Sequence, residues 1–199
     1  MRPLKEKKER SLGVKLFLKA ERCNSPKCVT VRRPYRPGVH GQKRKTLTEY
    51  GRQFQEKQKI QIYYGLTNRQ MRELFRSSSK DKIVERLQHR LDQAVFLLGF
   101  GSSPRVARQL VSHGHILVNN RKVTVPSYYV TIGDVIAVRS MSRSTHLFDD
   151  IALKLKQYTP PPWLTLNADE LKGECVVPAS ADNTTFPFDI NLVGEFYSR

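Results

Sequence analysis

The side chains best suited to chemistry in this chain are the cations of residues 22–48, a stretch that holds no acidic residue. Pro34, Pro37 and Gly38 are among the residues that disfavour regular structure there. Because like charges resist compaction, such a stretch becomes ordered when phosphates neutralise it, although it could instead be a loop that only keeps the chain soluble. The eight cations are Arg22, Lys27, Arg32, Arg33, Arg36, Lys43, Arg44 and Lys45, and the rings that could stack on bases are Tyr35, His40 and Tyr50.

Cys23 and Cys28 form a Cys-x4-Cys pair, which supplies two of the four ligands that structural zinc needs. No cysteine or histidine precedes Cys23, Cys175 is remote in sequence, and nothing supports His40 as a substitute. We therefore predict no metal and two reduced thiols. Three cysteines also provide no disulfide framework, which favours a reducing compartment.

No set of residues suited to catalysis stands out. Gly99 and Gly101 lack the rest of a phosphate-binding motif and follow a predicted helix. His113 and His115 have no nearby acid or thiol to complete a metal site or a triad. We predict that the protein is not an enzyme and needs no cofactor.

Two helices are predicted in the middle of the chain. Apolar residues from Ile83 to Leu98 recur at close to four-residue spacing, which indicates one continuous amphipathic helix that Gly99 ends. Ser103 as a cap, followed by Pro104, favours a second helix over residues 104–113.

An antiparallel hairpin should follow. Strands over residues 115–118 and 121–125 are joined by Asn119 and Asn120, a residue type that tolerates positive φ. A further strand is predicted over residues 130–138, with a turn at Gly133. The predicted fold class is α+β, with two helices packed on a small, mostly antiparallel sheet.

The polar side chains of this central unit are mainly cations and neutral donors, which suit phosphates and 2′-hydroxyls. They should share one exposed surface, although an ordinary solvated face would look similar. Replacing Arg105 and Arg108 by alanine should weaken RNA binding and leave thermal stability nearly unchanged. The candidate residues are Arg105, Arg108, Gln109, Ser112, His113, His115, Asn119, Arg121 and Lys122.

Two shorter helices are predicted before this unit. A capping box at Thr46 and Glu49 begins a helix that runs to about Tyr64, and Thr67 with Gln70 begins another. The aromatic residues of these helices are more typical of a core than of base-stacking platforms. The cations expected to face outward are Arg52, Lys57, Lys59, Arg69, Arg72 and Arg76.

The C-terminal third is less regular. A polar loop over residues 140–145 should precede a helix over residues 147–157, and Trp163 should dock as an apolar anchor. Val176, Val177, Phe186 and Phe188 favour short strands or extended segments.

The formal net charge of +17 favours an anionic partner. Residues 1–90 hold 25 Lys and Arg against 8 Asp and Glu, whereas the remainder holds 10 of each. This asymmetry indicates a dedicated binding region. No apolar run approaches the length of a membrane span, and the N-terminus lacks the apolar region of a secretory signal, so no membrane partner is expected.

The segment RLDQAVFLLGFGSSPRVARQLVSHGHILVNNRKVTVPSYYVTIGDVI closely resembles the S4-type RNA-binding module. The flanking sequences RPGVHGQKRKTLTEYGRQFQEKQKIQIYYGL, PPPWL and EFYSR resemble the universal ribosomal family uS4, of bacterial or organellar type. The resemblance covers roughly residues 15–199, is weak near residues 179–189, and is specific because several blocks occur in the order found in the family. Some members carry an earlier Cys-x2-Cys that completes a zinc site, and this chain lacks it.

The resemblance implies three parts. Residues 1–45 would be an extended basic arm. Residues 46–86 would be a helical domain completed by residues 180–199, with Val193, Phe196 and Tyr197 buried against it. Residues 87–179 would form the inserted S4-type module and its wrap.

The resemblance also implies a structural protein that binds 16S-type rRNA early in small-subunit assembly and contributes to translational accuracy and mRNA entry. Its implied partners are rRNA, mRNA near the entry site and the neighbouring small-subunit protein five, in the cytoplasm or an organelle and without homo-oligomers. An RNA-modifying enzyme carrying the same module is disfavoured, because residues 139–199 contain no catalytic set. A small binder of stalled ribosomal subunits is disfavoured by the flanking blocks.

Overall fold

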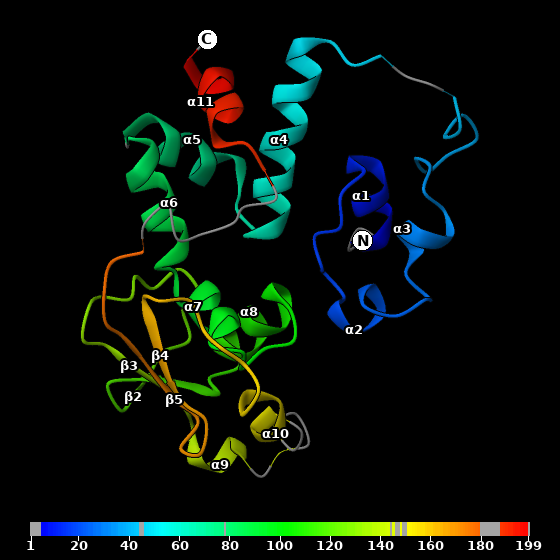
Figure 1. Ribbon diagram of the computed structural model, residues 1–199. Helices are drawn as coiled ribbons and strands as arrows, with labels where there is room; N and C mark the ends of the chain where they lie inside the picture. The colour runs from blue at the N-terminus through cyan, green and yellow to red at the C-terminus, as the bar shows by residue number, and fades with distance from the viewer. Residues whose placement is uncertain are drawn as a thin grey trace. The chain divides into compact units, whose positions relative to one another are not determined.

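The computed structural model describes residues 5–43, 46–77, 79–143, 145, 148, 151–179 and 188–198. The chain forms two compact units. Unit 1 comprises Met1–Lys80 and Phe186–Arg199, and unit 2 comprises Asp81–Thr185 (Figure 1). Helix and antiparallel sheet are both present, which confirms the α+β class. Among the described residues, no helix is long and apolar enough to cross a membrane.

The helix predicted from Ile83 to Leu98 is in fact two helices, and this is a correction. The break falls at His89 and Arg90, because polar groups here form hydrogen bonds with the extended segment 128–130 instead of continuing the helix. His89 Nδ1 lies 2.7 Å from the carbonyl oxygen of Val130, and the Leu91 amide donates to the Tyr128 carbonyl at 2.8 Å. The two helices are α6 (Lys80–Gln88) and α7 (Leu91–Leu97).

The predicted helix ends in unit 2 are confirmed. Gly99 has a φ of 80° and the Phe100 amide donates back to the Val95 carbonyl, which closes α7 with a Schellman motif. Ser103 then accepts a hydrogen bond from the Val106 amide at 3.3 Å and begins the next helix. That helix is α8 (Pro104–Ser112).

One five-stranded antiparallel sheet of order β2-β1-β3-β5-β4 lies beside these helices. Asn119 and Asn120 have positive φ values of 48° and 63°, as the predicted hairpin turn requires. The second and third predicted strands are shorter than expected, and β4 and β5 were not predicted. The strands are β1 (Ile116–Val118), β2 (Arg121–Lys122), β3 (Val135–Val138), β4 (Leu164–Asn167) and β5 (Lys172–Cys175).

The core of unit 2 lies between α7, α8 and one face of the sheet (Figure 1). Leu98 and Phe100 meet Ile136 there, and Trp163 is buried as the predicted anchor. Gly173 on β5 lies against Leu98, where a Cβ would collide with the leucine side chain. The expected polar loop after β3 contains the short helix α9 (Ser140–Arg143). The helix expected over residues 147–157 is α10 (Ile151–Leu155). Of the expected helix, residues 147, 149 and 150 lie outside the described residues.

Unit 1 contains three longer helices. The first is capped by Thr48, which accepts from the Gly51 amide, and not by Thr46 as expected. The predicted box at the second is confirmed, because the Thr67 and Gln70 side chains each accept from the other's backbone amide. The last helix was not predicted; it packs on the first and buries Val193. The helices are α4 (Glu49–Tyr63), α5 (Asn68–Ser77) and α11 (Ile190–Ser198).

The N-terminal segment is not the simple extended arm that was expected. Leu12, Leu16 and Leu18 form a small buried cluster against which Ile62 and Tyr63 of α4 pack. Apolar residues in the KLFLKA sequence thus allow local folding despite the surrounding charge. The short helices here are α1 (Lys5–Leu12), α2 (Ala20–Cys23) and α3 (Val29–Arg32).

Candidate nucleic-acid interface

The first cationic surface is a pocket of about 380 Å³ between α1, α2 and α3. Among the described residues that line it, Glu6 is the one acid, and its carboxylate forms an ion pair with Arg22 at 3.2 Å. The Arg10 guanidinium lies 5.0 Å from the Tyr35 ring centroid, and its Nε donates to the Tyr35 carbonyl at 3.1 Å. Arg10 and Arg22 thus have partners within the protein, and the other cations of the pocket, Lys7, Arg32 and Arg33, are placed to bind phosphates. The pocket is lined by Glu6, Lys7, Arg10, Arg22, Val29, Arg32, Arg33 and Pro37.

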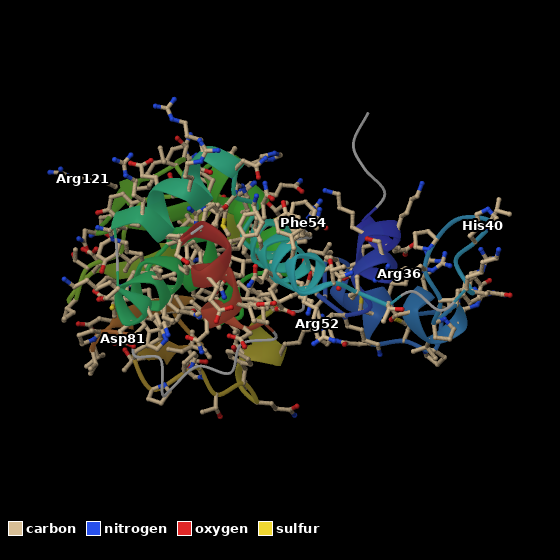
Figure 2. The ribbon with its side chains drawn as sticks, turned by 90° about the horizontal axis from the view of Figure 1, so that it is seen from above. Arg36, His40, Arg52, Phe54, Asp81 and Arg121 are labelled. Atoms are coloured by element: carbon tan, nitrogen blue, oxygen red, sulfur yellow. The ribbon has the colours of Figure 1, made fainter. Side chains whose placement is uncertain are left out.

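Lys7 and Arg10 of this pocket were missed at the sequence level, because acids accompany them in a mixed-charge segment. The predicted cations around them are mostly exposed, and Arg36 is half-buried. Arg36 and His40 lie on the loop after α3 (Figure 2). A Cβ added to Gly41 would collide with the Arg36 carbonyl, so this loop is tightly turned. Exposed residues are Arg22, Lys27, Arg32, Arg33, His40 and Lys43, while Arg44 and Lys45 lie outside the described residues.

The two cysteines of this segment are buried beside polar groups. Burial raises the pKa of Cys23, whose Sγ lies 4.0 Å from Glu9 Oε2. Burial also opposes ionisation of Cys28, but hydrogen bonds from Thr30 outweigh it and lower its pKa. Across the described residues no group of three or more potential ligands is arranged to hold a metal. Glu9 Oε1 accepts the backbone amides of Leu16 and Leu18, so this carboxylate has a structural role beside the thiols.

The predicted cations of α4 and α5 divide into two groups. Arg52, Arg69 and Arg72 are exposed, as expected, and so is Arg76. Lys57 and Lys59 do not face outward freely, and this is a correction: both are half-buried, Lys57 over aromatic rings and Lys59 paired with Glu56. For Lys57 the reason is that α11 packs on α4 and brings the rings of Phe196 and Tyr197 over this lysine.

Tyr50 and Phe54 are partly exposed on α4 and contact Phe196 of α11. The Tyr50 and Phe196 ring centroids are 5.6 Å apart. The aromatic residues of this helix therefore form a half-exposed cluster rather than a fully buried core, and Phe54 is visible at the side of α4 in Figure 2.

In unit 2 the predicted residues lie on α8 and on the β1–β2 hairpin. Lys122 crosses Gly114, whose missing side chain makes room for the lysine stem. The His113 and His115 rings are 6.2 Å apart, so the end of α8 and the start of β1 share one surface. Arg121 points away from the hairpin (Figure 2). The exposed residues here are Gln109, Ser112, His113, Arg121 and Lys122, and the half-buried ones are Arg105, Arg108 and His115.

Three predicted residues of this surface also serve the fold. Arg108 lies 3.5 Å from the buried carboxylate of Asp92, which Arg90 binds at 3.1 and 2.8 Å. His115 Nδ1 lies 3.0 Å from the Ser142 hydroxyl. The side chain of Asn119, although exposed, donates to Asp134 and accepts from the Val135 amide, so both of its polar atoms already take part in the fold. No local pattern shows these distant partners.

Two helices packed on an antiparallel sheet, with exposed cations and donors on α8 and the β1–β2 hairpin, are typical of a nucleic-acid-binding module. Residues 89–136 match the model of the S4 domain, and residues 3–93 match that of the ribosomal protein S4/S9 N-terminal domain.

Curated relatives extend the match to nearly the whole chain. The small ribosomal subunit protein uS4 of Thermus thermophilus is 46% identical over 194 residues, covering 94% of this chain and 93% of the relative. The corresponding protein of Halothermothrix orenii is 42% identical over 193 residues, with the same coverage. This chain belongs to the uS4 family of small ribosomal subunit proteins, whose members are structural proteins and not enzymes.

Proposed function

We propose that this protein is a structural component of the small ribosomal subunit in the cytoplasm and binds small-subunit rRNA directly. The observation that carries the proposal is the 46% identity to a uS4 protein over 94% of the chain. Cationic surfaces in both units support it, since phosphate contacts dominate the affinity of such proteins. The rRNA-facing residues would be the exposed cations of α1–α5, together with Gln109, His113, Arg121 and Lys122.

Finer roles are part of the same proposal. The protein would bind early in subunit assembly, contact the neighbouring small-subunit protein five, and act near mRNA entry with an influence on accuracy. It would do so as a single copy. The basic segment of residues 22–43 supports contact with more than one RNA, because its exposed cations read charge and not sequence.

The test compares the 5′ domain of small-subunit rRNA with random RNA of equal length across a salt series. Neutralising about eight phosphates predicts a log–log slope of about −6 to −7 for both RNAs. A preference for the rRNA that persists at high salt supports shape recognition. Equal binding that collapses with salt would show a nonspecific polycation and contradict the proposal.

A further inference from the structure

An open cavity of about 710 Å³ lies in unit 1 between α4, α5 and α11. Three cations and three aromatic rings share it, and none of the described residues that line it is acidic. This combination differs from that of the pocket at α1–α3, whose described lining contains cations and an acid but no aromatic residue. The lining residues are Lys57, Asn68, Arg72, Phe75, Arg76, Gly194, Phe196, Tyr197 and Ser198.

One of the three cations, Lys57, lies over aromatic rings. Lys57 Nζ lies 4.7 Å from the Phe196 ring centroid and 5.5 Å from that of Tyr197. Burial lowers the pKa of Lys57, and the charge of Arg72 acts in the same direction. Because repulsion between neighbouring cations is relieved by a bound anion, the cavity favours a negatively charged group.

Two further features indicate a ligand with a planar, polar part. The Tyr197 hydroxyl is buried and has no hydrogen-bond partner among the described residues, so its capacity for hydrogen bonds is unused within this part of the chain. The Phe75 and Tyr197 rings stack with centroids 5.3 Å apart. Beside them, a Cβ added to Gly194 would meet no atom within 4 Å, so α11 leaves open space there.

We propose that this cavity binds one unpaired nucleotide of an RNA. Arg72 and Arg76 would hold its phosphate, and its base would lie against the rings of Phe75 and Tyr197. A paired helix offers phosphates but keeps its bases stacked, whereas a bulged base can enter a pocket. An acidic peptide would use the cations and leave the rings without a partner. The inference rests on the proposed function, because it names a substrate feature for an RNA-binding protein.

The experiment uses the full chain and two RNA duplexes that differ only by a single-nucleotide bulge. The unmodified protein should bind the bulged duplex at least about five-fold more tightly, the scale of one base stacked on an aromatic ring. Gly194→Leu should abolish this preference, because leucine fills the open space without removing a cation or a ring. Asn191→Leu, at an exposed position of the same helix, is the control and should keep it. Melting curves should show both variants folded, since leucine favours helix more than glycine or asparagine does.

A second pair of variants tests the phosphate contact. Arg72→Gln should weaken binding of the bulged duplex more than Arg69→Gln, which removes the same charge from an exposed position of α5 outside the cavity. Equal losses, or a bulge preference that survives Gly194→Leu, would overturn the proposal. A third result would also overturn the proposal: no bulge preference, together with RNA binding that polyglutamate inhibits in the unmodified protein but not in Gly194→Leu. The cavity would then bind an acidic peptide. If the unmodified protein prefers rRNA over random RNA but shows no bulge preference, only this inference fails; without an rRNA preference, the proposed function fails.

Discussion

At the scale of single residues, Glu9 organises the N-terminal segment. It is 2% exposed, and its Oε1 accepts the backbone amides of Leu16 and Leu18 at 3.2 and 3.1 Å. The chain between α1 and α2 would otherwise bury two unpaired amides. The carboxylate thus holds this turn of the chain against α1 by hydrogen bonding.

Replacing Glu9 by alanine should lower the free energy of unfolding by about 2–4 kcal/mol, because two buried amides lose their acceptor. Glu9→Gln keeps a carbonyl oxygen in place and should cost about 1 kcal/mol. Urea unfolding of the full chain measures both. Equal losses would mean that the negative charge matters, and not the acceptor.

Arg108 shows why exposure on a helical wheel is a poor guide to a residue's role. The sequence predicts a free RNA-binding cation, yet in the structure Arg108 and Arg90 flank the carboxylate of Asp92. We therefore predict that removing Arg108 reduces stability as well as RNA binding, whereas the sequence alone predicts nearly unchanged melting. Arg90 keeps Asp92 paired, so the loss should be smaller than for an isolated buried charge.

At the scale of elements, Asp134 connects the hairpin turn to the turn before β3. Its Oδ1 accepts from Asn119 at 2.7 Å, and its Oδ2 accepts from the Thr131 amide and hydroxyl at 2.8 and 2.9 Å. Burial opposes its charge, but hydrogen bonds from Thr131 and Asn119 outweigh burial and lower its pKa below the ordinary value of 3.8. The two turns are thus held by one carboxylate.

This lowered pKa predicts acid sensitivity. Above the ordinary pKa of 3.8 the contribution of Asp134 to stability is fully present, and it is lost as the pH falls through the lower folded value. Asp134→Asn should cost about 1–2 kcal/mol near neutral pH and should flatten the fall in stability as the pH drops below 3.8. Asp169→Asn, at an exposed acid of the same unit, is the matched control. An unflattened curve for Asp134→Asn would assign the acid sensitivity to other groups.

At the scale of the whole molecule, the excess charge lies in the first 90 residues, whereas the rest of the chain is balanced. Residues 91–199, which carry nearly all of the S4 domain, therefore have no net charge. We infer that the basic segment supplies most of the salt-dependent affinity, and that the S4 module contributes shape recognition.

Changing Arg32 and Arg33 together to glutamine should reduce the magnitude of the salt slope by about 1.4–1.8, the value for two phosphate contacts. Lys154 and Lys156 are exposed in unit 2, and their double change to glutamine removes the same net charge. This control should leave the slope nearly unchanged. Filter binding to the rRNA 5′ domain measures both, and equal effects would mean that only net charge matters.

The features that could be predicted from the sequence are those that depend on near neighbours in the chain. Gly99 and Gly114 end helices because they accept positive φ, Ser103 caps the next helix, and the Asn119–Asn120 turn forms for the same local reason. The order of motifs likewise predicted the uS4 family, which the relatives confirm.

Features that depend on distant residues required the tertiary structure. The break at His89 arises from hydrogen bonds to residues about 40 positions later. Lys57 faces rings from α11, a helix that the sequence pattern did not predict, and the cavity beside it exists only where three helices meet. Side-chain roles such as these depend on which partners surround a polar group in the folded chain. Composition and spacing carry no information about partners that folding brings together from distant parts of the sequence.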